Sequence, residues 1–163
     1  MTPSDAAARR VGRERAVQWL YQWELSGLDL DDVLSRQHQV EVHEPDRERD
    51  AWAIELVRGT ARELHRIDPL ITQHATNWRI ERMAVVDRVI LRLGVYELLC
   101  TPDTPPAVVI DEAVELARTF SADQAVPFVN GVLDAVHRGL AASAAGTGAL
   151  DPGPGSAAGG ASS

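Results

Sequence analysis

The most continuous apolar segment of the chain runs from Val85 to Leu99 and predicts a buried helix. Apolar residues recur there at steps of three and four, and others widen this face until it covers most of the helical cylinder. Gly94 lies in the middle of the segment and indicates close approach by another helix. Four charged residues interrupt the pattern, and each must reach a partner or an edge: Asp87, Arg88, Arg92 and Glu97.

The same periodicity predicts helices on both sides of this segment. Before it, helices are expected from about Arg10 to Leu25 with Gly27 as the stop, from Leu30 to about Gln39, from Pro45 to about Leu64, and from an N-cap at Asp68 to about Trp78. After the proline-rich turn 101–106, helices are expected from Val108 to Phe120 and from Phe128 to Val136. No segment alternates as a strand does, so we predict an all-α fold of about seven helices.

Composition divides the chain into three parts. Residues 1–8 are small and polar and are expected to be flexible, and residues 9–138 form the helical domain. Residues 139–163 are nearly all Gly, Ala, Ser or Pro, with Asp151 as the one charge. Such a segment buries too little apolar surface to offset its ordering entropy, so we expect a disordered tail.

The charge is unevenly distributed. The net charge is −8, yet the start of the chain holds four arginines: Arg9, Arg10, Arg13 and Arg15. At the N-terminal end of a helix, arginines oppose the helix dipole unless an anion joins them, and free amide groups there help to hold a phosphate. These residues are therefore either nucleic-acid contacts or a solvated helix end. All basic residues are arginine, which suits phosphate contacts but is equally a coding bias.

The sequence offers no catalytic constellation, and we predict a protein that is not an enzyme and has no cofactor. Cys100 closes an apolar helix, where a packed, inert thiol is expected. His38 and His43 lie in a polar run that is read as a solvated loop rather than a metal site. A single cysteine and the lack of a signal peptide or membrane span predict a cytoplasmic location.

Four stretches of the chain, in order, match the sequence motifs of one known protein family. The start A-A-R-R-V-G-R-E-R-A-V-Q-W-L-Y resembles that family's arginine-rich beginning, and D-R-V-I-L-R with Y-E-L resembles its central motif. Two further matches are P-A-V-V-I-D-E-A-V-E-L-A and F-V-N-G-V-L. Together these stretches resemble the NusB family of transcription antitermination factors, and the likeness covers roughly residues 9–136. It implies two small helical subdomains and a non-catalytic role.

The resemblance also implies partners. Members of the family bind the boxA element of single-stranded leader RNA together with NusE, a ribosomal small-subunit protein. The heterodimer joins the RNA polymerase antitermination complex. The acidic body of this chain fits a basic ribosomal protein and would confine RNA to the positive end.

Carried over by position, the resemblance implies seven RNA-binding residues: Arg9, Arg10, Arg13, Tyr21, Asp87, Phe120 and Gln124. Guanidinium groups for phosphates and aromatic faces for bases are what single-stranded RNA needs. Structural interpretations stay open beside these: Tyr21 as a core residue, Phe120 as helix-end packing and Asp87 paired with an arginine. For Asn130 and Gly131 we expect helix packing rather than ligand contact.

Two alternative functions remain. Some RNA cytosine methyltransferases carry a NusB-like helical domain at the N-terminus, but no methyltransferase fold follows residue 138 here. A homodimer that masks its own RNA surface is the other alternative.

Overall fold

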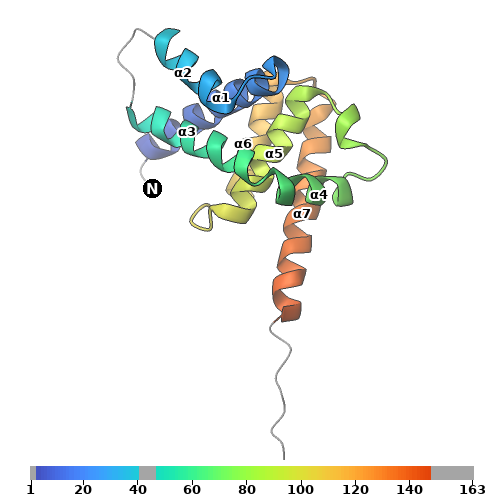
Figure 1. Cartoon of the computed structure of the whole chain (residues 1–163). Coiled ribbons are helices and arrows are strands. Elements are labelled where there is room, and N and C mark those ends of the chain that lie inside the picture. The colour runs from blue at the N-terminus through green and yellow to red at the C-terminus, as the bar shows by residue number, and fades with distance from the viewer. Residues whose placement is uncertain (1–2, 41–46, 148–163) are drawn as a thin grey trace, which may run out of the picture.

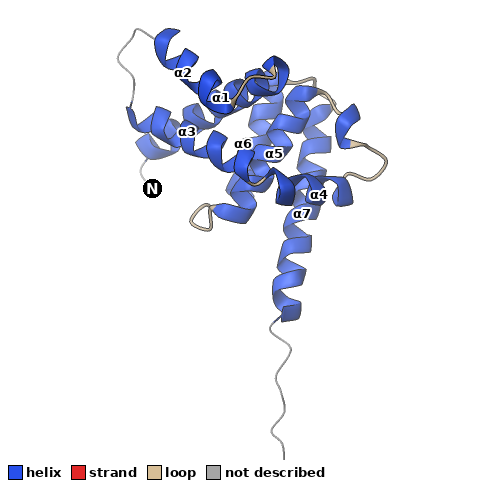
Figure 2. Ribbon diagram, viewed as in Figure 1, coloured by secondary structure: helices blue, strands red, loops and turns tan. Residues whose placement is uncertain are grey.

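The computed structural model describes residues 3–40 and 47–147 of the chain, and helices make up most of these ranges (Figure 1). Their bounds are α1 Pro3–Ser26, α2 Leu30–Val40, α3 Arg47–Arg62, α4 Leu64–His74, the short 3₁₀ helix η1 Ile80–Arg82, α5 Val85–Cys100, α6 Pro106–Phe120 and α7 Ala125–Thr147. Figure 2 shows only helices and loops in the described ranges. The prediction of an all-α fold with seven α-helices is confirmed.

Helix α5 is the centre of the core, as its apolar pattern predicts. It contacts α1, α3, α4, α6 and α7, and Ile90, Leu91 and Leu93 are fully buried. Most of the remaining helices form two groups around it, and α4 packs against α5 and α7. Helices α1, α2 and α3 pack together on one side, while α6 and α7 pack against each other on the other (Figure 1).

The charged residues of α5 all have partners, which confirms the expectation from sequence. Arg88 and Arg92 both bind Glu24 of α1, the latter at 2.9 Å. Arg92 also makes two contacts, at 2.8 and 2.9 Å, with the carboxylate of Asp68 on α4. Arg88 donates to the carbonyl oxygen of Ile80 at 3.0 Å. These contacts tie α1, α4 and η1 to the central helix.

Two glycines of the helical core mark close contacts. A Cβ atom on Gly94 would lie 2.8 Å from Leu133 of α7, which confirms the predicted close approach of a second helix. A Cβ atom on Gly59 of α3 would overlap the ring of Tyr96 on α5. Gly27 has a φ of 65° and follows the last residue of α1, so it is the C-terminal stop that was predicted.

Both ends of the helical domain extend further than predicted. Helix α1 begins at Pro3 rather than near Arg10, and α7 continues to Thr147 rather than ending before Gly139. Alanines are frequent in both extensions, and alanine has the highest helix propensity. Residues 3–8 and 139–147 are therefore helical, beyond the predicted bounds 9–138 of the helical domain. Residues 1–2 and 148–163 lie outside the described ranges.

The predicted helix start at Asp68 is wrong. Helix α4 begins at Leu64 and contains Pro69 in its interior. Ile67 and Ile71 are fully buried on either side of the proline, so packing keeps this turn helical. Asp68 serves as the partner of Arg92 and does not cap the helix.

Asn130 and Gly131 do not pack against another helix. Both are exposed on α7, and a Cβ atom on Gly131 would have no described neighbour within 4 Å. The expected packing role is therefore wrong. His43 and the predicted helix start at Pro45 lie outside the described residues. Among the helices described, none is long and apolar enough to cross a membrane.

Candidate nucleic-acid interface

One face of α1 is polar and wholly or partly exposed along three turns. Arg10, Glu14, Gln18 and Tyr21 follow one another at steps of four, four and three residues, so they share one side of the helix. We call these four residues the outer stripe. The Arg10 side chain is 55% exposed, and Tyr21 is 40% exposed. The interpretation of Tyr21 as a core residue is therefore wrong.

Arg10 lies at the first end of the outer stripe, where α1 meets α6. Its guanidinium makes two contacts, at 3.1 and 2.8 Å, with the carboxylate of Glu112. This hydrogen-bonded partner raises the pKa of Arg10 above its ordinary value. Exposed ion pairs contribute only about 0.2–1 kcal/mol, so a phosphate can replace Glu112 as the partner at little cost.

Arg9 lies beside this position and is half-buried. Its guanidinium carbon is 4.8 Å from the ring centroid of Trp52, and Nη1 donates to Thr104 Oγ1 at 3.4 Å. Arg9 is the seventh residue of α1, so its amide group falls within the helical hydrogen-bond ladder. The expectation that free amide groups help these arginines to hold a phosphate is wrong, because the helix starts at Pro3.

Arg13 points into the protein. Its Nε and Nη2 atoms each donate to Glu97 of α5 at 2.8 Å, and the two side chains are only 3% and 2% exposed. A buried charge is stable when it is paired and hydrogen-bonded, which explains why Glu97 is tolerated in the central helix. The prediction of Arg13 as a direct RNA contact does not fit this position, and we correct it to a structural one.

The other end of the outer stripe borders a groove of about 540 Å³. Gln18 and Tyr21 from α1, Val86 from α5 and Phe120 from α6 are among the residues that line it. Phe120 also packs against the core, so its interpretation as helix-end packing is confirmed. The structure thus brings Tyr21 and Phe120 together at one groove, although ninety-nine positions separate them in sequence.

Asp87 and Gln124 lie near the turn that follows α6. Ser121, the C-cap residue of α6, donates a hydrogen bond from its hydroxyl to the half-buried carboxylate of Asp87. Among the described residues Asp87 has no arginine partner, so the alternative of an internal ion pair is wrong. Gln124 is exposed immediately before α7.

Helices α1 and α6 run side by side in the same direction. Arg10 pairs with Glu112, and further along both helices Tyr21 and Phe120 line the same groove. The predicted residues thus form a cationic end and an aromatic end, about 17 Å apart at 1.5 Å per residue of α1. Sequence reasoning missed Gln18, which helical spacing from Tyr21 could have found. It also missed Trp52 beneath Arg9, which no local pattern indicates.

This arrangement offers guanidinium groups, aromatic rings and amide side chains on one surface. Those groups suit phosphates, base faces and base edges respectively. Among the residues described, no three His, Cys, Asp or Glu side chains gather as a metal site requires.

A family model and the sequences of known proteins all match this chain to the same family. The model of the NusB family matches residues 10–138. The chain is 48% identical over 132 residues to the transcription antitermination protein NusB of Solibacter usitatus, which covers 81% of this chain and 90% of that protein. It is 46% identical over 130 residues to the protein of the same name from Streptomyces avermitilis, covering 78% and 89%.

Solved structures agree with the sequence relatives. T. maritima NusB superimposes with a TM-score of 0.70 at 34% identity, covering 80% of this chain and 90% of that one. A chain from the crystal structure of antitermination factors NusB and NusE in complex with dsRNA has a TM-score of 0.72 at 29% identity, covering 82% and 98%. From its first helix to the end of its packed core, the chain belongs to the NusB family of transcription antitermination proteins.

Proposed function

We propose that this protein binds the boxA element of nascent leader or ribosomal RNA as a heterodimer with NusE. The complex then helps RNA polymerase in the cytoplasm to resist termination. The observation that carries the proposal is the joint surface of α1 and α6, with arginines at one end and Tyr21 and Phe120 at the other. The solved complex of a similar NusB with NusE and dsRNA supports it.

The proposal gives each predicted site residue a role. Arg9 and Arg10 bind phosphates, and Arg10 exchanges Glu112 for the RNA backbone. Tyr21 and Phe120 stack on bases, because aromatic rings bind the faces of unpaired nucleotides. Asp87 and Gln124 hydrogen-bond to base edges beside this groove. Arg13 positions α1 from within the core.

The partner supplies the rest of the RNA surface. A chain with a net charge of −8 attracts a basic ribosomal protein and repels RNA outside its cationic end. Two weak RNA surfaces held in one heterodimer bind a single strand more tightly than either surface alone. We therefore propose that NusE increases the affinity for boxA without changing the contacts of α1.

Fluorescence anisotropy of labelled boxA RNA, with and without NusE and over a series of salt concentrations, tests the proposal. Tighter binding with NusE and a preference for boxA over a scrambled strand are expected. Replacing Arg9 and Arg10 with Ala should flatten the dependence of log K on log salt by about 1.4, at about 0.7 per phosphate contact. Arg138→Ala, at an exposed arginine of α7, is the control and should leave the slope unchanged.

Two results would contradict the proposal. If the protein with NusE binds boxA no better than a scrambled strand, the proposed function is wrong. The protein would then be a helical scaffold that binds a different partner. The second result would come from sedimentation of the protein, first alone and then with RNA. If the protein is a homodimer that dissociates when RNA is added, the dimer covers the RNA-binding surface. If the homodimer stays intact and does not bind RNA, the RNA does not bind at the outer stripe.

A further inference from the structure

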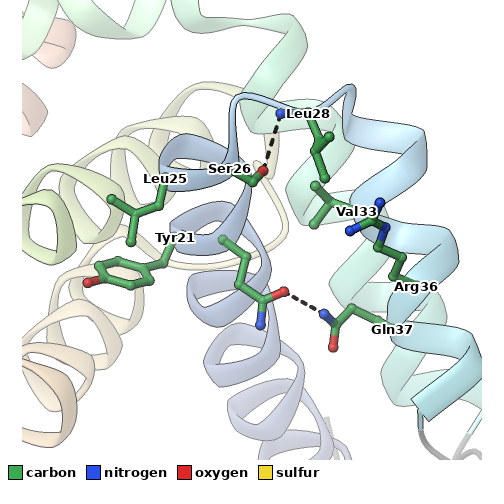
Figure 3. Close-up of a pocket in the computed structure, with 8 residues that line it drawn as sticks. Tyr21, Leu25, Ser26, Leu28, Val33, Arg36 and Gln37 are labelled. Carbon is green, nitrogen blue, oxygen red and sulfur yellow. Dashed lines mark hydrogen bonds between the residues drawn. The ribbon is translucent and has the colours of Figure 1, made fainter.

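A second groove lies on the other side of Tyr21, between α1 and α2 (Figure 3). Its volume is about 310 Å³. Tyr21 and Leu25 project from α1, and Val33 and Arg36 come from α2 (Figure 3). We call it the α1–α2 groove. The role proposed above for the α1–α6 surface makes no use of it.

The α1–α2 groove is continuous with the larger groove beside Phe120. Tyr21, Gln22 and Gln37 line both of them. Gln37 donates a hydrogen bond from its side-chain amide to the side-chain oxygen of Gln22, and this contact joins α2 to α1 (Figure 3). A ligand in the larger groove therefore meets the α1–α2 groove directly beyond Tyr21.

The lining combines an apolar face with an arginine that has no ion pair among the described residues. Leu25 is 59% exposed and Tyr21 is 40% exposed, so the two side chains give the groove an apolar surface that solvent can reach. Arg36 is exposed and makes no salt bridge with any described residue, whereas the nearby Asp31 is engaged by Arg58 at 2.9 Å. A guanidinium that has no ion-pair partner among the described residues can donate charge-assisted hydrogen bonds to a phosphate.

We propose that the α1–α2 groove is a nucleotide subsite, in which an RNA base lies against Tyr21 and Leu25 and its phosphate binds Arg36. This inference rests on the proposed function, because it extends the RNA strand from the larger groove past Tyr21. The volume is at the lower end of the roughly 300–1,000 Å³ of small-molecule sites, so it suits a single nucleotide. An apolar protein segment would cover Arg36 without supplying an opposite charge, so RNA is the better match.

The test uses labelled RNAs that carry the boxA core alone or the core with four added nucleotides at the 5′ or the 3′ end. The full chain with NusE should bind one of the extended strands more tightly than the core. Arg36→Ala should abolish that gain and flatten the salt dependence on the extended strand by about 0.7. The same variant should bind the core RNA as the parent protein does. Arg138→Ala, at a 73% exposed arginine on α7, is the matched control and should retain the gain.

The outcomes separate the two proposals. If the protein binds core boxA but gains nothing from either extension, or if Arg36→Ala keeps the gain, the subsite is refuted while the proposed function stands. If the protein with NusE does not distinguish boxA from a scrambled strand, the proposed function fails and the subsite with it. If Arg36→Ala instead weakens NusE binding in the absence of RNA, the α1–α2 groove is a protein-docking site and the subsite is again refuted.

Discussion

Arg13 of α1 and Glu97 of α5 form a two-point salt bridge inside the protein, with both N–O distances at 2.8 Å and neither side chain more than 3% exposed. The arginine-rich start of the chain therefore serves two purposes. Arg10 faces solvent on the outer stripe, while Arg13, one turn further, connects the first helix to the central helix. Residues of one type and one segment differ in role because helical geometry points them in different directions.

Replacing Arg13 with Ala should destabilise the protein strongly. The change leaves the Glu97 carboxylate buried without a counter-charge, which typically costs about 3–5 kcal/mol. Urea unfolding measures the loss. Arg10→Ala is the matched control, and because its pair with Glu112 is exposed, the expected cost is below about 1 kcal/mol.

A double variant shows whether the loss comes from the unpaired charge. Arg13→Met combined with Glu97→Leu replaces the pair by apolar side chains of similar size, and it should recover most of the stability. If Arg13→Ala keeps full stability but loses RNA affinity, the structural role assigned to Arg13 is wrong.

Two glycines on helices should respond in opposite ways to alanine. Gly59→Ala places a methyl group against the ring of buried Tyr96, so we expect a loss of about 1–3 kcal/mol. Gly131→Ala adds a methyl group in open space on α7, and the better helix propensity should stabilise the protein by about 0.5–1 kcal/mol. Thermal or urea unfolding of both variants gives the comparison. A loss of stability in both would refute the assigned environment of Gly131.

Stability should fall at alkaline pH in a manner that depends on Tyr96. Burial raises the pKa of the Tyr96 hydroxyl above its ordinary value of 10.0. The unfolded chain then releases this proton at a lower pH than the folded protein does, so stability is complete below about pH 10 and declines as pH rises towards the folded pKa. Unfolding in urea from about pH 8 to about pH 11 should show a smaller decline for Tyr96→Phe. Equal declines in the two proteins would contradict this assignment.

Tyr21 should contribute to RNA affinity through its ring. Tyr21→Ala is expected to weaken boxA binding by about 1–3 kcal/mol, the usual value of one base–aromatic stack, and Tyr21→Phe should retain most of the affinity. Anisotropy titrations with NusE present measure both. Since Tyr21 is 40% exposed, unfolding experiments should find little change in stability. If the Ala and Phe variants bind boxA RNA with equal affinity, the ring of Tyr21 does not contact the RNA.

Much of the fold could be predicted because its signals are local. The apolar run from Val85 predicts α5, and the charges within it predict ion pairs that the structure contains. The errors come from tertiary contacts that outweigh local signals. Pro69 reads as a helix start, yet Ile67 and Ile71 are buried around it and keep α4 continuous.

The candidate site was predictable in composition but not in geometry. Resemblance to a family indicated Tyr21 and Phe120, and the structure brings both to one groove. Which arginine of the first helix faces inward depends on the position of Glu97, and that position follows from packing rather than from the charge pattern. Arg36, on which the proposed nucleotide subsite rests, lies in an acidic segment of the sequence, so no local pattern singles it out.

The two faces of α1 differ in how they can tolerate amino-acid substitutions. Glu24 and Arg13 anchor the inner face to α5, and Gln18 and Tyr21 lie on the outer face. Substitutions at outward positions can therefore alter ligand preference while the anchors preserve the fold. Mutations on the two faces should combine additively, because the affected side chains share no partner. The ligand preference of this helix can therefore change during evolution while the residues that pack in the core stay the same.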